Sequence, residues 1–162
     1  MDLTRHYARI DRIDALATRL LARYSVDFLR ISLGLVFLGF GLLKFVPGLS
    51  PAQDLAEETM ARLTFDLVPG GVGLVLVASL ETAIGLCLVT GKFLRLGLAL
   101  LGMAMVGILS PLVLLPGELF DRPYEPTLAG QYVLKDLVLL AAGLVVTASV
   151  KLGRNVADRP AA

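Results

Sequence analysis

GVGLVLVASLETAIGLCLVT, residues 71–90, is long enough and apolar enough to cross a lipid bilayer. Its only charged residue is Glu81, near the middle of the stretch. A charged side chain at the centre of a membrane helix costs at least about 2.5–3.5 kcal/mol, so such residues usually face the protein interior and pair with one another. The stretch therefore predicts that Glu81 has a partner in another apolar segment.

The composition of the chain supports a membrane protein. Its 162 residues are 56% hydrophobic, with a mean hydropathy of +0.78, whereas soluble domains are about 45–50% apolar. The net charge of +1 gives no reason to expect a nucleic-acid partner. With one cysteine, Cys87, and one histidine, His6, the chain has no intrachain disulfide, CxxC pair or histidine cluster. We expect no metal site and no thiol-redox pair.

Three further apolar stretches predict an all-α fold, an integral membrane four-helix bundle. The predicted spans are 27–46, 71–90, 96–115 and 127–150. Residues 26–150 would form the transmembrane domain, and residues 151–162 a cytoplasmic tail. Residues 1–25 carry apolar side chains at helical spacing beside several arginines, which predicts a separate amphipathic helix. That helix either lies in the headgroup layer of anionic lipid or packs on the protein as a solvated helix.

The sequence also predicts a surface helix between the first two spans and a kink within the third. Ser50, Pro51 and Gln53 are typical of a helix start with a capping box, which predicts a surface helix to about Asp66. That helix is too polar to span, so we expect it to cover the outer face of the bundle. Within the third span, Pro111 predicts a kink, and Ser110 is available to bond the freed backbone.

The distribution of lysine and arginine predicts the orientation. The segments before the first span, between the second and third, and after the fourth carry ten of these residues: Arg5, Arg9, Arg12, Arg19, Arg23, Lys92, Arg95, Lys151, Arg154 and Arg159. The opposite side carries Arg62 and Arg122. By the positive-inside rule, both termini are cytoplasmic, and the surface helix and the proline-rich loop before the fourth span lie outside.

The candidate site is a cluster of charges within the spans. Lys44 and Lys135 lie only a few residues below the outer ends of their helices and could reach Glu81. With Asp136, the four side chains have a net charge of zero, which is the least costly arrangement within a membrane. Tyr132 falls near Asp136 around the fourth helix. Three interpretations remain open: pairs that lock the helix register, a cavity for a headgroup, quinone carbonyl or proton, or lysines that snorkel outward above a protonated Glu81.

Parts of the chain resemble a known family. The segments are RISLGLVFLGFGLLKF at 30–45, Glu81 followed by Gly85, and GQYVLKDLVLL at 130–140. They are similar to DoxX-like membrane proteins, and the last segment and Lys44–Pro47 resemble the YkgB/RclC-type inner-membrane group. The resemblance implies a multi-pass protein of the bacterial inner membrane with four helices. Some members serve membrane oxidoreductases that pass electrons to quinone, and others are linked to oxidative stress.

The sequence and the resemblance together favour an accessory component that binds a quinone or lipid at Lys44, Glu81, Lys135, Asp136 and Tyr132. Its partner would be a membrane oxidoreductase or a stress-response protein. We predict no catalytic residues, and an independent oxidoreductase ranks last because no redox ligands are visible. The alternatives are a small proton-coupled transporter that uses Glu81 and a purely structural or assembly subunit. The glycine-rich helices also leave room for a homo-oligomer.

Overall fold

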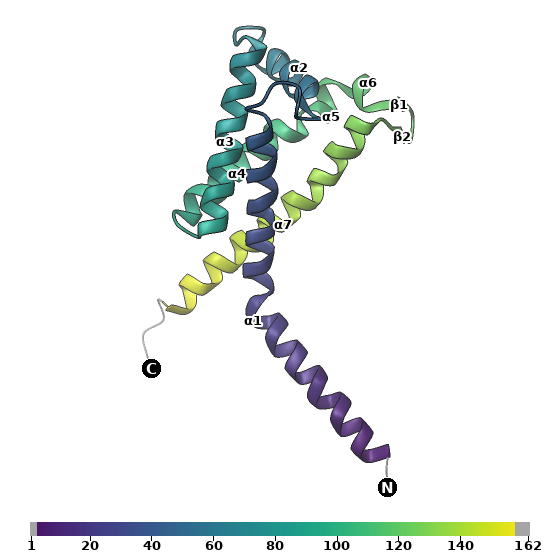
Figure 1. The fold of residues 1–162 in the computed structure, drawn as a ribbon, viewed down its shortest axis with the longest axis vertical. Helices are drawn as coiled ribbons and strands as arrows, with labels where there is room; N and C mark the ends of the chain where they lie inside the picture. Colours follow the sequence, from purple (N-terminus) through teal and green to yellow (C-terminus); the bar gives the residue numbers. More distant parts are fainter. Residues whose placement is uncertain (1–2, 158–162) are drawn as a thin grey trace.

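The structure is a computed structural model that describes residues 3–157, with side chains described from 14 to 150. Within this part of the chain, helices dominate and one short hairpin is present (Figure 1). The elements are α1 (Leu3–Leu43), α2 (Gln53–Thr64), α3 (Gly70–Thr90), α4 (Leu94–Leu109), α5 (Pro111–Leu114), α6 (Pro116–Leu119), β1 (Phe120–Arg122), β2 (Glu125–Pro126) and α7 (Leu128–Ala157).

Four segments are long and apolar enough to cross a membrane: Asp14–Leu43, Gly70–Thr90, Leu94–Leu114 and Leu128–Val150. They include the four predicted spans to within a few residues, apart from the longer start of the first, and most of their surface faces outward, as expected for helices in lipid. The predicted all-α membrane bundle is therefore confirmed. The first span ends at Leu43 rather than at 46, because the chain turns at Lys44 before Pro47.

The N-terminal segment and the first span form one continuous helix, α1, instead of two elements with a break near residue 26. Between Asp14 and Leu33 the sequence contains neither glycine nor proline, so nothing ends the helix there. Figure 1 shows the first part of α1 running obliquely away from the other helices. The side chains before residue 14 lie outside the described part.

The start of the surface helix α2 differs from the predicted capping box. Ser50 is buried, and its hydroxyl has no hydrogen-bond partner among the described residues. Gln53 instead accepts a hydrogen bond from the amide of Gly48 at 2.8 Å and donates to Glu57 at 2.9 Å. The residue pattern located the helix correctly, but the glutamine bonds the preceding turn because the chain enters α2 through a tight turn.

The predicted kink in the third span is present as the junction between α4 and α5. Pro111 has no N–H to give to the carbonyl of Gly107, four residues earlier. The Ser110 hydroxyl donates to that same carbonyl at 2.7 Å. The span ends at Leu114, and the short helix α6 and an antiparallel pair, β1 and β2, follow it.

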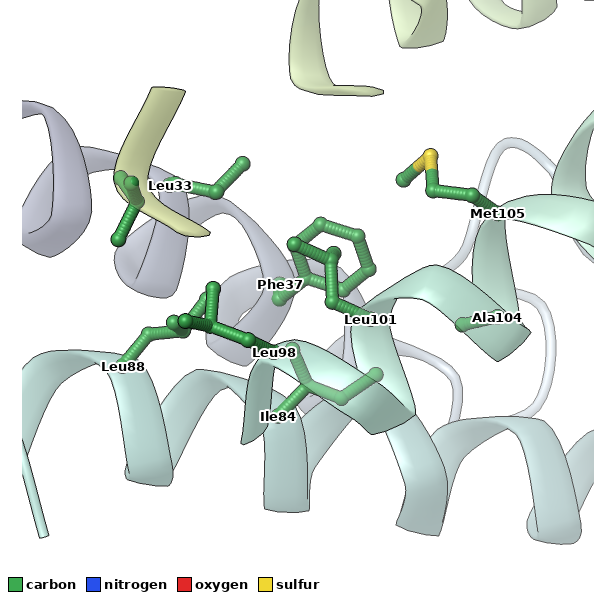
Figure 2. Close-up of a cluster of buried hydrophobic side chains, with 9 residues drawn as sticks. Leu33, Phe37, Ile84, Leu88, Leu98, Leu101, Ala104 and Met105 are labelled. Carbon is green, nitrogen blue, oxygen red and sulfur yellow. The ribbon is translucent and has the colours of Figure 1, made fainter. Parts of the chain in front are cut away.

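The core of the bundle lies between α1, α3, α4 and α7. Nine buried apolar side chains form one cluster, most of them visible in Figure 2. They are Leu33, Phe37, Ile84, Leu88, Leu98, Leu101, Ala104, Met105 and Val146. Lipid is as apolar as this core, so dispersion contacts and close backbone approach hold the helices together more than the hydrophobic effect does.

Arg30 ties the first span to the end of the second. Its guanidinium donates to the carbonyls of Leu88 and Val89 in the last turn of α3, and it lies 3.4 Å from the carboxylate of Asp27. Those carbonyls have no partner within the helix, and a cation there also favours the helix dipole. Arg30 therefore caps the last turn of α3.

We expect Arg30→Met to lower the stability of the protein by about 1.5–3 kcal/mol, the range for hydrogen bonds to charged groups. Methionine keeps an apolar stem but leaves the α3 carbonyls without their donor. Thermal unfolding in detergent measures the loss. Arg62→Met is the control, because Arg62 forms an exposed pair with Glu58 within α2. Equal melting of the two variants would contradict the capping role.

Candidate functional site

A buried ion pair joins the end of α1 to α3 near the end of the bundle that α2 covers. The Lys44 ammonium lies 2.6 Å from Oε2 of Glu81, and the two side chains are only 6% and 7% exposed. The pair is one of the two contacts considered for Glu81 from the sequence. Removing water from a single charge is costly, so at this depth the attraction between the ammonium and the carboxylate has to offset the desolvation cost of both groups.

Close packing of α1 on α3 aligns this pair. A Cβ added to Gly41 would stand 2.7 Å from the backbone nitrogen of Thr82, and one added to Gly85 would stand 2.5 Å from the nitrogen of Leu38. Only glycine permits this approach. Lys44 follows Gly41 by three residues, so it lies just beyond the contact, where its side chain meets Glu81.

A cavity of about 260 Å³ adjoins the ion pair. Its walls come from α1, α3, α4, α5 and α7, and α2 covers it with apolar side chains. Most of the lining is apolar: Val36, Phe37, Phe40, Ala52, Leu55, Ala56, Met60, Leu63, Val77, Leu80, Met103, Ala104, Gly107, Ile108, Pro111, Val133 and Leu139. The polar lining is confined to Lys44, Thr59, Glu81, Tyr132 and Asp136.

Asp136 and Tyr132 enter the same cavity from α7. Asp136 is half-buried, and its charge interacts with those of both Lys44 and Glu81. Among the described residues it has no hydrogen bond or ion pair, because Lys44 is bonded to Glu81. Two carboxylates and one ammonium thus share the polar end of the cavity. The Asp136 carboxylate can therefore accept a hydrogen bond from the donor group of a ligand, or take up a proton.

Lys135 does not join the cluster predicted for it. Its side chain is exposed, it does not line the cavity, and its ammonium lies 5.4 Å from the centre of the Tyr132 ring. One residue along a helix turns the side chain by about 100°, and the face of α7 that lines the cavity, with Tyr132, Val133, Asp136 and Leu139, leaves Lys135 outside it. Because Tyr132 lies about one turn nearer the start of α7, the Lys135 side chain extends toward that end of the helix.

The sequence did not identify several wall residues of the cavity. Thr59, Met103 and Gly107 line it, but no local pattern distinguishes them from residues that face lipid or fill the core. A Cβ added to Gly107 would meet no atom within 4 Å, so this glycine is not needed for a close helix contact. Gly39 is likewise open, so the first span uses Gly34 and Gly41 for its close contact.

Cys87 lies away from this site. It is partly buried, and a Cβ added to Gly97 on α4 would stand 2.5 Å from that of Cys87. Its neighbourhood indicates a packing role between α3 and α4. Within the described residues, no group of three His, Cys, Asp or Glu side chains is arranged to hold a metal ion.

Part of the chain matches a known protein family. A family model described as DoxX matches residues 25–114, more than half of the chain. Lys44 and Glu81 lie inside the matched segment, whereas Tyr132 and Asp136 lie beyond it on α7. Searches of curated proteins and of solved structures found no match.

Proposed function

We propose, from the premise that this chain belongs to the DoxX family of membrane proteins, that it is an accessory membrane component that binds a small lipid-soluble molecule in the cavity beneath α2. A quinone head or a lipid end is the ligand class we favour. The protein acts beside a membrane oxidoreductase or a stress-response protein, in a bacterial inner membrane, and it is similar to the YkgB/RclC-type proteins.

The observation that carries this proposal is the composition of the cavity wall. It is apolar over most of its surface and polar only where Lys44, Glu81, Tyr132 and Asp136 meet. Ligand sites have this form, with an apolar wall for affinity and a few polar groups that set orientation. A wall made only to lock the helices together would be expected to close on itself, since empty apolar space forfeits contacts.

The size and chemistry of the cavity favour a ring or a chain end with an oxygen function. Drug-sized ligands occupy about 300–1,000 Å³, so a cavity of about 260 Å³ suits a head group rather than a whole long-chain lipid. The Lys44 ammonium and the Tyr132 hydroxyl can donate to a carbonyl, and the Asp136 carboxylate can accept from a hydroxyl. The ring faces of Phe37 and Phe40 can pack against the ligand.

We expect Gly107→Leu to reduce the retained ligand at least tenfold. Gly107 lines the cavity, and a Cβ there meets nothing within 4 Å, so the longer side chain fills the space while every charged group stays in place. Wild type and variant are purified from native membrane, and mass spectrometry measures the quinones, lipids and proteins that copurify.

Gly102→Leu is the matched control for this experiment. Gly102 is on the same helix, and a Cβ there also meets nothing within 4 Å, but it is exposed and does not line the cavity. Both changes remove a helix glycine, so both should gain a little stability. Equal recovery of small molecules from the two variants would overturn the proposed ligand site.

A further inference from the structure

The segment 14–25 of α1 extends beyond the polar end of the bundle. Arg30 marks that end, because it caps α3 just before the charged turn that contains Lys92 and Arg95. At about 1.5 Å per residue, the helix from Arg30 back to Asp14 is about 24 Å long. Figure 1 shows this part of α1 projecting away from the other helices. It therefore lies on the side predicted to be cytoplasmic, outside the packed helices.

An apolar stripe on this segment has no cover. Every residue from 14 to 25 is exposed, and the larger apolar side chains are 52–66% exposed. They are Leu16, Leu20, Leu21 and Tyr24. Leu16, Leu20 and Tyr24 recur every four residues, so they share one face of the helix. A leucine face of this kind is stable in water only when something apolar covers it.

Arginines follow one edge of the apolar stripe. Arg19 and Arg23 are four residues apart, and the guanidinium of Arg23 lies 5.4 Å from the centre of the Tyr24 ring. The nearest acidic residue of the segment, Asp14, falls on the opposite edge. The sequence before residue 14 continues the basic repeat with Arg5, Arg9 and Arg12. Charge and apolar surface are thus arranged as in helices that bind the surface of anionic membranes.

We propose that residues 14–25 dock in the headgroup layer of an anionic leaflet, with the leucine stripe toward the acyl chains and the arginines toward lipid phosphates. The same helix continues into a membrane span, so it is already held at the lipid surface and loses little freedom on docking. The basic edge is complementary to anionic lipid. This proposal is independent of the ligand proposed for the cavity.

The chain contains no tryptophan, which allows a test with one reporter at a time. Leu20→Trp places the reporter on the stripe, and Thr18→Trp places it about 160° around the helix, on the polar side. Each full-length variant is reconstituted in vesicles of phosphatidylcholine, alone or mixed with phosphatidylglycerol, with or without brominated acyl chains. In the anionic vesicles we expect Leu20→Trp to emit at shorter wavelength and to be quenched at least threefold more than Thr18→Trp.

The charge requirement is tested by Arg19→Gln combined with Arg23→Gln in the Leu20→Trp chain. We expect its quenching in anionic vesicles to fall to the level in phosphatidylcholine alone. Equal quenching and water-like emission of the two reporters would overturn the proposal. A second result would also overturn it: a Leu20→Trp reporter that emits at short wavelength to the same extent with and without anionic lipid, and whose shielding increases with the ratio of protein to lipid. A second copy of the chain, and not the membrane, would then cover the stripe.

Discussion

Lys44→Met should destabilise the bundle by about 3–5 kcal/mol, the usual cost of removing one partner from a buried ion pair. The substitution leaves the buried Glu81 without its only ion-pair partner among the described residues. Asp136, the next charged group in the cavity, is also a carboxylate and cannot replace the lysine. Thermal and denaturant unfolding in one detergent, compared with wild type, measures the difference.

Glu81→Gln should cost less than Lys44→Met, because it leaves Lys44 beside Asp136, with which it already interacts. The double variant Lys44→Met/Glu81→Gln should recover part of the loss, since no unpaired charge then remains in the pair. The recovery is the coupling energy between the two side chains. Lys92→Met, in the exposed turn after α3, is the control and should change stability by less than about 0.5 kcal/mol. Strictly additive single losses would show that the pair does not hold the two helices.

The membrane spans could be predicted from the sequence because their signal is local. Each span consists of about twenty apolar residues, and the solvent imposes that length on every membrane helix. The need of Glu81 for a charged partner could also be predicted, because few charges occur at membrane depth and an isolated one is costly. The choice between Lys44 and Lys135 was not accessible. It depends on how far α7 is rotated about its axis, which the packing of the whole bundle determines.

The cavity could not be predicted for a related reason. Its walls come from six helices, so it exists only once α2 has packed against α3 and α5 and once α7 has packed against α1 and α4. Residue type alone does not distinguish Gly107, which faces open space, from Gly85, which touches the backbone of another helix. Both are glycines within apolar spans, and only the structure gives them opposite roles.

The two roles of glycine lead to the second large prediction. The contact of α1 with α3 is a repeated interdigitation, in which Gly34, Gly85 and Gly41 each receive the facing helix. Added methyl groups at Gly85 and Gly41 would meet backbone atoms of the partner, at 2.5 Å and 2.7 Å. Backbone atoms cannot rotate away as side chains do, so relief requires the two helices to separate.

Gly85→Ala should therefore destabilise the protein by about 1–3 kcal/mol or more, despite the higher helix propensity of alanine. Separation of α1 from α3 would also lengthen the distance between Lys44 and Glu81, so the variant should lose cavity ligand along with stability. Gly39→Ala adds the same methyl group to α1, where nothing lies within 4 Å, and should stabilise by up to about 1 kcal/mol. Thermal melting of both variants in one detergent measures the difference in stability. If Gly85→Ala were as stable as Gly39→Ala, α1 and α3 would not meet at this distance. The alignment of the ion pair would then have another cause.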